Sequence, residues 1–426
     1  KKLLMKEIKE GLKAKGKYKK EYLDRCKEEY DVICYHGFED YFLIVQDYVR
    51  WAKNRGIEVG PGRGSVCNCL LAYALDITDV DSLFFDLDFR RFLRMDKKKL
   101  PDIDLDFETE RRAEVIEYIV NTYKGNAARI CSYGLYKVDN LVNDLVKVCG
   151  LGDPDKKDEY YADKKKEADA TKKQIKAAIN KYIDKETGNF DYEAAKQDSD
   201  IMVFNKLYDN IIVHFSKLYK KVRFYGTHAA GVAVSGLQIN NYTAIERRAK
   251  EAYTTSYDLI DIEQINAVKF DMLGLRTMSI LKELREITGQ TKFNYDWLYD
   301  DKLYEQFGLA NTDGIFQFEA KGAKSVLQAI DCDCYEDVFA ASALNRPGPL
   351  SLGMVEQYEE SKDAFRNNRK AKAGKDNIFF NYAKDTYGCF VYQEQIMKIC
   401  VELGKMTLAD ADKTLKFLIA GVILPE

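Results

Sequence analysis

The sequence predicts an α+β protein, and three observations support that prediction. Several stretches place apolar residues at helical spacing, among them 1–30 and 38–56. Two other stretches, 100–107 and 267–274, alternate apolar and charged residues with the period of two that a β-strand requires. The 426-residue chain is 46% apolar and 32% charged, which is typical of a globular protein with two or three domains.

The composition also excludes several classes of protein. The sequence has no apolar run long enough to span a membrane and no secretory signal peptide, so we expect a cytoplasmic protein without a membrane partner. Its ten cysteines form no CxxC pair and only three histidines occur, so we expect reduced thiols and no zinc site. The net charge of −3 means that any basic groove must be local. Because residue 1 is a lysine, we expect a fragment.

The stretch LPDIDLDF, residues 100–107, carries the strongest chemical signal. In a strand, Asp102, Asp104 and Asp106 point to one face and the apolar residues between them to the other. Carboxylates about 7 Å apart repel one another. Mg²⁺ or Mn²⁺, which prefer oxygen ligands, can offset that repulsion, and two such ions can stabilise the attacking and leaving oxygens of a phosphoryl transfer. The alternative interpretation is an edge strand with a solvated acidic face.

A glycine-rich loop, GPGRGS at 60–65, precedes the acidic strand. Gly62 and Gly64 permit a close backbone approach, while Arg63 and Ser65 offer hydrogen-bond donors. An apolar helix follows, and its N-terminal end would favour an anion such as a triphosphate. The loop is not a P-loop, because no Gly-Lys-Ser/Thr follows at the required spacing. The alternative is a structural turn before a buried helix.

The stretches before and after the acidic strand contain a second pair of aspartates and two predicted helices. A second DxD pair, Asp86 and Asp88, is followed at once by two arginines, so we expect these carboxylates to be paired locally and to take no part in chemistry. The stretch 108–124 has helical spacing, and the apolar run 130–150 is also expected to be helical.

Residues 152–200 are rich in lysine and poor in apolar side chains. We expect a helical hairpin in a separate subdomain, with lysines that could face the phosphates of a nucleic acid. The alternative is a solvated helix balanced by its own acids. The lysines concerned are Lys164, Lys165, Lys166, Lys172, Lys173 and Lys176.

The second half of the chain adds further polar positions. On the strand predicted at 267–274, Lys269 and Asp271 share one face, and Asp271 could supply a third carboxylate to a two-metal site. Small residues follow His228, which favours a structural role for that histidine. Towards the end, Arg346 precedes a Pro-Gly-Pro break and Tyr392 begins a helix. Such a cation could reach a triphosphate, and such a tyrosine could stack on a base.

Eight motifs occur in a fixed order along the chain. They are GPGRGS (60–65), FDLDFRRFL (85–93), PDIDLDF (101–107), THAAGV (227–232), VKFDMLGLRT (268–277), TDGIFQFE (312–319), NRPGPL (345–350) and YGCFVYQEQIM (387–397). Together they resemble the catalytic core of the bacterial family C replicative DNA polymerases, the family of the DNA polymerase III alpha subunit. The motifs are distributed over most of the chain, apart from the lysine-rich segment.

The resemblance implies roles for individual residues. Asp102, Asp104 and Asp271 match the aspartates that hold two Mg²⁺ ions in the family, with Mn²⁺ as a substitute, and Asp106 becomes their neighbour. Lys269 is implied to lie near the primer end. The residues implied to contact the incoming nucleotide are Arg63, Gly64, Ser65, Arg91, Arg346, Tyr392, Gln393 and Gln395.

The resemblance also implies a mixed-sheet palm like that of nucleotidyltransferases, a helical thumb and mostly helical fingers. The implied boundaries are 1–133 for the first part of the palm with its amino-terminal helices, 134–226 for the lysine-rich thumb, 227–276 for the second part of the palm and 277–426 for incomplete fingers. The sequence departs from the family at 413–421, where KTLKFLIAG replaces an arginine-rich segment. The family's PHP domain, clamp-binding region and OB domain have no counterpart here, which suggests a fragment or a compact or viral member.

The implied reaction is template-directed addition of deoxynucleotides to a primer 3′ end with release of pyrophosphate. The implied partners are primer–template DNA, deoxynucleoside triphosphates and, through regions outside this sequence, a sliding clamp. The expected location is the cytoplasm, at the nucleoid or in a host cell if the protein is viral. Two alternatives stay open: a non-catalytic DNA-binding relative and a template-independent nucleotidyltransferase. No exonuclease motif occurs, so no proofreading is expected.

Overall fold

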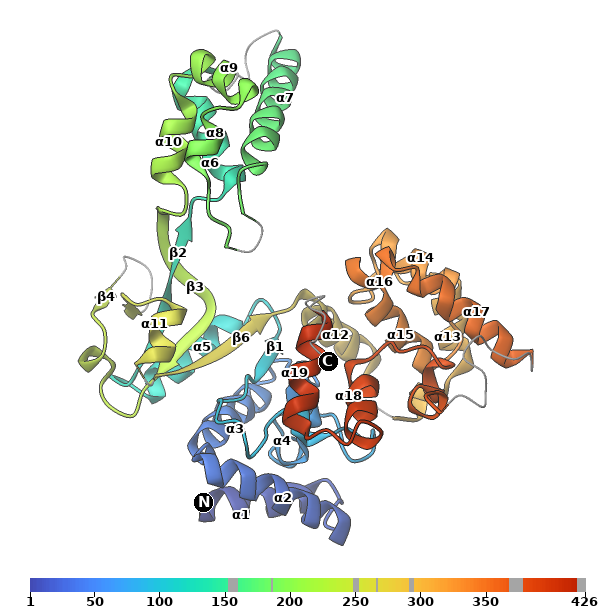
Figure 1. Ribbon diagram of the computed structural model, residues 1–426. Coiled ribbons are helices and arrows are strands. Elements are labelled where there is room, and N and C mark those ends of the chain that lie inside the picture. Colours follow the sequence, from blue (N-terminus) through green and yellow to red (C-terminus); the bar gives the residue numbers. More distant parts are fainter. Residues whose placement is uncertain are drawn as a thin grey trace. The chain divides into compact units, whose positions relative to one another are not determined.

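The computed structural model describes residues 1–151, 160–184, 187–247, 253–265, 267–290, 295–367 and 378–419 (Figure 1). The chain divides into two compact units. The first unit joins Lys1–Arg112 with Gly274–Glu426, and the second unit is Ala113–Leu273. Helices dominate the first unit, whereas the second combines a mixed sheet with a group of helices, so the α+β class is confirmed.

Four helices form the start of the first unit. They are α1 (Lys2–Ala14), α2 (Lys20–His36), α3 (Glu39–Asn54) and α4 (Leu70–Ala74). The first three confirm the helices expected at 1–30 and 38–56. α1 crosses α4 at Gly11, where a Cβ atom would lie 1.7 Å from the carbonyl oxygen of Ala74. Only glycine therefore allows this close crossing.

The acidic strand is shorter than its alternation predicts. β1 spans Asp104–Phe107, whereas Asp102 and Ile103 precede it. The backbone amide of Ile103 donates to the Tyr41 hydroxyl at 3.2 Å. Its hydrogen-bond partner is therefore a side chain and not a neighbouring strand. The alternation itself holds, because Ile103, Leu105 and Phe107 are buried.

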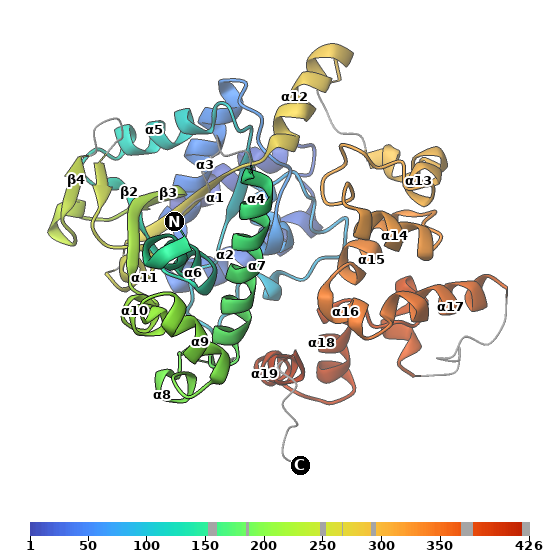
Figure 2. The ribbon, with the colours of Figure 1, turned by 90° about the horizontal axis from the view of Figure 1, so that it is seen from above.

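Helices also make up the rest of the first unit. They are α12 (Arg276–Thr288), α13 (Asp301–Gly308), α14 (Lys321–Ala329), α15 (Tyr335–Leu344), α16 (Pro347–Ser351), α17 (Met354–Arg366), α18 (Gln393–Glu402) and α19 (Leu408–Ile419). Figure 2 shows α13, α14 and α15 gathered beside one another, with α17 close by. Leu327, Leu344 and Tyr358 are among the buried residues of their shared core. Across the described part of 276–418 there is no strand, as expected for this region.

A mixed sheet organises the second unit. Its strands are β2 (Ala127–Leu135), β3 (Val222–Val234), β4 (Ile245–Arg247), β5 (Tyr253–Thr255) and β6 (Val268–Gly274). In the described part of this unit they lie side by side in the order β6, β3, β2, β5, β4. β2 runs parallel to β5, and the other neighbouring pairs are antiparallel.

The prediction of a helix over 130–150 is wrong for the first part of that range. Residues up to Leu135 belong to β2, because they pair with β3 from Ala127↔Val234 to Leu135↔Val222. The stacked rings of Tyr133 and Tyr225, 5.1 Å apart, reinforce that pairing. An apolar run of this kind suits a helix or a strand, and the distant partner strand decides between them.

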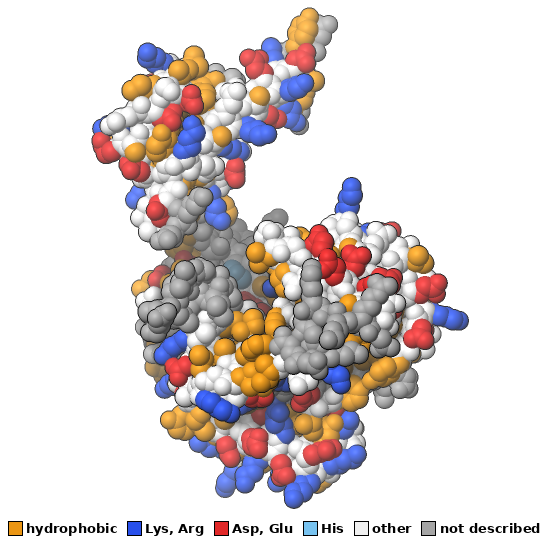
Figure 3. Space-filling view, turned by 45° about the vertical axis from the view of Figure 1, so that its right-hand side comes forward, with side chains coloured by type: hydrophobic (Ala, Val, Ile, Leu, Met, Phe, Trp, Pro, Cys, Tyr) orange, Lys and Arg blue, Asp and Glu red, His pale blue; other side chains and the backbone are white. Residues whose placement is uncertain are grey.

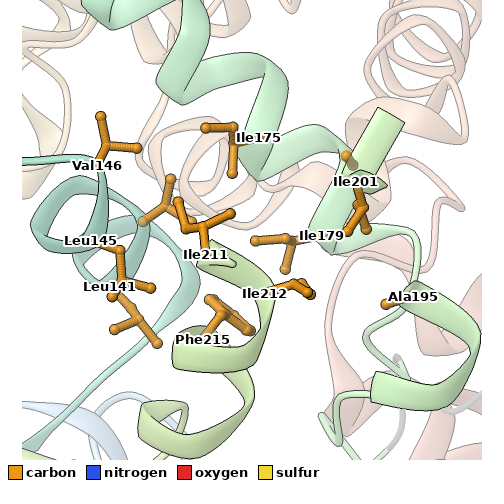
Figure 4. Close-up of a cluster of buried hydrophobic side chains, with 12 residues drawn as sticks. Leu141, Leu145, Val146, Ile175, Ile179, Ala195, Ile201, Ile211, Ile212 and Phe215 are labelled. Carbon is orange, nitrogen blue, oxygen red and sulfur yellow. The ribbon is translucent and has the colours of Figure 1, made fainter. Parts of the chain in front are cut away.

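A group of helices follows β2 and leads into β3 (Figure 1). It contains α6 (Val138–Val146), α7 (Tyr161–Asn180), α8 (Tyr192–Ala195), α9 (Ser199–Leu207) and α10 (Ile211–Leu218). Leu141, Ile175, Ile179 and Phe215 point into its own apolar core (Figure 4). α7 is the lysine-rich helix expected here. Among the helices that the structure describes, none is both long and apolar enough to cross a membrane.

Candidate active site

The three aspartates of the acidic stretch differ in burial and in partners. Asp102 is exposed, Asp104 is partly exposed and Asp106 is buried. One carboxylate oxygen of Asp102 lies within 4.8 Å of one from Asp104, a spacing that suits a shared metal ion. Asp106 instead forms an ion pair with Arg63 at 3.0 Å. Asp106 is therefore paired internally, as a neighbour of the pair formed by Asp102 and Asp104.

The glycine-rich loop is fastened beside β1. The amide of Gly60 donates to the carbonyl of Asp106 at 2.8 Å, and the carbonyl of Pro61 accepts from the Thr78 hydroxyl at 2.6 Å. At Gly62, a Cβ atom would lie 2.4 Å from the oxygen of Thr78, so no other residue fits. Gly64 has a φ of 63°, in the left-handed region that glycine adopts readily. The loop thus holds Arg63 and Ser65 next to the acidic strand.

The helix start after the loop has an internal partner that its sequence does not predict. The amides of Leu70 and Leu71, at the start of α4, donate to the carboxylate of Glu29 at 3.1 and 2.8 Å. Glu29 is fully buried, and burial raises its pKa. Arg25 donates both to Glu29 and to the carbonyl of Leu87, at 2.7 and 2.9 Å. An internal carboxylate therefore occupies this helix terminus, and the same pair ties α4 to the segment before Arg91.

A cavity of about 240 Å³ lies against this region of the first unit. It brings two acidic residues, a hydroxyl and a group of cations to one place. Its lining includes Ser65, Arg90, Arg91, Arg94, Lys97, Lys99, Asp102, Met397 and Asp412. Five cations lie beside Asp102 in this lining, and such a combination of charges could accept a polyanion that also carries a metal ion.

Two of these arginines are held by near neighbours in sequence. Arg90 donates to Asp88 at 2.7 Å, and Arg94 donates to Asp96 at 2.8 Å. Burial alone would raise the pKa of Asp88, but the hydrogen bonds from Arg90 lower it below its usual value. The local pairing expected for Asp88 is therefore confirmed. Asp86 sits at a turn with a φ of 50°.

Arg91 contacts residues that lie near the other end of the sequence. Its guanidinium donates to Gln393 at 3.0 Å and pairs with Glu394 at 3.0 Å, both on the first turn of α18. The structure thus brings together two of the residues implied to contact the nucleotide, Arg91 and Gln393, although 302 positions separate them.

The other positions at this end of the chain differ in exposure. Gln395 is buried, accepts from the amides of Val391 and Tyr392 at 2.9 Å each, and so caps α18. Tyr392 is the residue before α18, and burial raises its pKa. Arg346 is exposed and precedes α16. Gln395 therefore shapes the start of α18, while Arg346 remains accessible.

In the second unit, Lys269 and Asp271 lie on β6 as the alternation predicts. The Lys269 ammonium lies 2.6 Å from Oδ2 of Asp271. The other carboxylate oxygen, Oδ1, is buried and has no hydrogen-bond partner among the residues that the structure describes. A buried carboxylate oxygen without a partner is costly, and a bound ion would satisfy it.

The lysines singled out in the lysine-rich segment all lie on α7. Lys164, Lys165, Lys166 and Lys173 are exposed, whereas Lys172 and Lys176 lie 3.6 and 3.1 Å from Asp169 and Asp139. Figure 3 shows basic and acidic side chains intermixed over the helical group at its top. The surface is therefore not uniformly basic. The part of the segment at 152–159 lies outside the described residues.

Sequence reasoning missed four of the five cations around Asp102. Arg90, Arg94, Lys97 and Lys99 lie in the stretch FRRFLRMDKKKL that leads directly into the acidic strand. That concentration of cations before three carboxylates was the available signal. Only the two arginines at its start, Arg90 and Arg91, enter the prediction that Asp86 and Asp88 are paired locally.

Comparison with known proteins identifies the family of the chain. The family model described as the bacterial DNA polymerase III alpha NTPase domain matches residues 1–274, and that of the bacterial DNA polymerase III alpha subunit finger domain matches 276–418. The chain is 35% identical over 408 residues to the DNA polymerase III subunit alpha of Pseudomonas aeruginosa, covering 92% of this chain and 33% of that protein.

Two further relatives give the same result. The DNA polymerase III subunit alpha of Aquifex aeolicus is 33% identical over 94% of this chain and 35% of its own length. That of Escherichia coli K12 is 32% identical over 93% of this chain and 34% of its own. The chain thus spans about a third of the length of the curated relatives it matches. These matches show that the chain belongs to the family of bacterial DNA polymerase III alpha subunits.

Proposed function

We propose that the chain is the catalytic core of a template-directed DNA polymerase, which adds deoxynucleotides to a primer 3′ end and releases pyrophosphate. Its family supports this proposal, because the matched relatives carry the polymerase name. The single observation that carries it is the cavity in which Asp102 lies beside five cations.

The cavity suits a nucleoside triphosphate. Arg91, Arg94 and Lys97 would offset the charge of the phosphate groups, and Ser65 would donate a hydrogen bond from the glycine-rich loop. Arg63 and the backbone at Gly64 would approach the same phosphates, since the loop is fastened next to β1.

The carboxylates fit divalent metal ions. Asp271 would join Asp102 and Asp104 to hold two Mg²⁺ ions, for which Mn²⁺ can substitute. The Asp102 and Asp104 oxygens, which lie within 4.8 Å of each other, support this, as does the buried Oδ1 of Asp271, which has no partner within the described ranges. Bound there, the ions would lower the pKa of the primer 3′-hydroxyl and offset the charge of the leaving pyrophosphate.

The chain's own residues would orient the substrates. The ammonium of Lys269 holds one oxygen of Asp271, so it would keep that carboxylate in position and present a cation near the primer end. Arg346, Tyr392 and Gln393 would contact the nucleotide and the template base. Gln395 would act through the start of α18, which it caps.

The DNA would be held mainly through its backbone. In this proposal 1–133 and 227–276 form the palm, 134–226 the thumb and 277–426 the fingers. The separate apolar core of α6–α10 supports an independent thumb. The phosphate contacts would come from lysines on α7, namely Lys164, Lys165, Lys166, Lys172, Lys173 and Lys176. Such an enzyme would work in the cytoplasm, where replication of bacterial DNA takes place.

Primer extension tests this function directly. The protein is mixed with a labelled primer–template and all four deoxynucleotides, in Mg²⁺ or in excess chelator, and with the primer alone. Extension that needs both Mg²⁺ and template supports the proposal. Binding of DNA with no extension would identify a non-catalytic relative, and extension of the primer alone would identify a template-independent transferase.

A further inference from the structure

The pairing of β3 with β2 is interrupted by a large bulge in the second unit. Cys131 pairs with Thr227 and Arg129 pairs with Val232, so two residue steps on β2 match five on β3. The extra residues leave backbone amides without ladder partners. At its end the bulge reaches Gly231, which is the register partner of Asp271 on β6. Bulges next to functional residues commonly redirect a side chain.

His228 satisfies the amides that the bulge releases. Its Nδ1 accepts from the amide of Ala230 at 3.3 Å and from that of Gly231 at 2.8 Å. A Cβ atom at position 231 would lie 2.9 Å from Nδ1 and 3.5 Å from Oδ1 of Asp271, so glycine is needed for the ring and the two strands to meet. The ring is therefore fixed beside the aspartate that is proposed to hold metal.

The same hydrogen bonds decide which ring nitrogen carries the proton. Because Nδ1 accepts two hydrogen bonds, the proton lies on Nε2, which is a donor. The side chain is partly exposed, and Nε2 has no hydrogen-bond partner among the described residues. Asparagine or aspartate would cap a bulge of this kind equally well, since they bond their own backbone two residues on. The second nitrogen of histidine is not needed by the fold.

We propose that His228 is a DNA-binding residue whose Nε2–H donates to a backbone phosphate of the primer strand next to its 3′ end. This inference rests on the proposed polymerase function. The chemistry recognised is an anionic phosphate oxygen, which DNA and nucleotide share. The primer strand is favoured because the cations that suit a triphosphate line the cavity of the first unit, whereas His228 lies near Asp271, the partner of Lys269, in the second.

Two variants separate binding from a structural role. His228→Asn keeps an acceptor near the Nδ1 position for the two amides but removes the Nε2 donor, while His228→Ala removes both. The matched control is His214→Asn, which changes an exposed histidine of α10 outside the bulge. For each protein we would measure the affinity for primer–template DNA over a range of salt, the nucleotide KM in primer extension, and the urea midpoint of unfolding.

We expect His228→Asn to weaken DNA binding about tenfold or more, as for loss of a hydrogen bond to a charged group. Its nucleotide KM and urea midpoint should stay at the wild-type values. The slope of log K against log salt should also be unchanged, because a neutral donor displaces no counterion. His228→Ala should lose the same affinity and also unfold at lower urea. His214→Asn should behave as wild type.

Wild-type DNA affinity in His228→Asn would overturn the inference and leave the histidine as a cap for the bulge. A raised nucleotide KM with unchanged DNA affinity would also overturn it, since the phosphate would then belong to the nucleotide. If the wild-type protein extended no primer, the polymerase function would fall. The DNA affinities of the three variants would still decide whether His228 binds a phosphate.

Discussion

Glu394 should compete with the nucleotide triphosphate for Arg91. The Arg91 guanidinium lines the cavity and lies 3.0 Å from the Glu394 carboxylate. The two side chains are 24% and 52% exposed, so water screens the pair, and pairs of this kind contribute about 0.2–1 kcal/mol. Since about 1.4 kcal/mol is a factor of ten, Glu394→Gln should lower the nucleotide KM by about 1.4-fold to fivefold.

Arg91→Ala should change the KM in the opposite direction. It removes a hydrogen bond from a cation to phosphate, which is worth about 1.5–3 kcal/mol, so the KM should rise about tenfold to a hundredfold. The double variant should match Arg91→Ala alone, because Glu394 would act only through Arg91. Glu402→Gln, the same change at the other end of α18, is the control and should leave the KM unchanged.

The assay is steady-state primer extension at saturating DNA over a range of nucleotide concentration. A KM that rose in Glu394→Gln would refute the competition, because Glu394 would then orient Arg91 for the triphosphate. A KM that still fell in the double variant would show that Glu394 acts on the nucleotide without Arg91. Either result would require a different account of how Arg91 and α18 interact.

Four further results are expected. Asp104→Asn and Asp271→Asn should each slow single-turnover extension in Mg²⁺ by about 10²–10³, whereas Asp88→Asn should leave the rate near wild type; a reversed order would contradict the assignment. Arg63→Ala should raise the nucleotide KM more than it weakens DNA binding, and the opposite pattern in paired titrations would move the loop to the template side. Replacing the six α7 lysines by glutamine should flatten the slope of log K against log salt by about 0.9 for each DNA phosphate that the protein no longer neutralises, and an unchanged slope would exclude α7 from the interface. Lys362→Met should reduce the free energy of unfolding in urea by about 3–5 kcal/mol, because the buried Asp337 carboxylate would lose its cation; a loss below about 1 kcal/mol would show that the pair is not structurally important.

The sequence predicted the elements whose pattern is local. On β6 the alternation of charged and apolar residues placed Lys269 and Asp271 together, and the strand predicted at 267–274 ends at Gly274, just before the helix α12. The apolar run at 130–150 shows the limit of such patterns. Its first residues form a strand because β3, almost a hundred positions later, supplies the hydrogen bonds. Nothing within the run itself records that partner.

The partners of charged side chains were harder to predict, because they come from distant parts of the chain. Arg63 lies 43 positions before Asp106, with which it pairs, and Arg91 meets Gln393 over 302 positions. The spacing of Asp102, Asp104 and Asp106 gives the three carboxylates equal weight. Only the folded structure shows that Asp106 already has an arginine.

The hydrogen-bond partners of a polar group therefore show whether the fold satisfies it or whether a ligand could. Asp88 and Asp106 each have an arginine partner, so the fold itself satisfies them. Asp271 keeps a buried oxygen without a partner in the described part of the chain, at a cost of about 1–3 kcal/mol that a ligand could recover. The Nε2 donor of His228 has no partner among the residues that the structure describes, and the bulge that holds its ring ends at Gly231, the register partner of Asp271. This acceptor and this donor thus lie on paired strands, where an ion and a phosphate could supply the partners that the described residues do not.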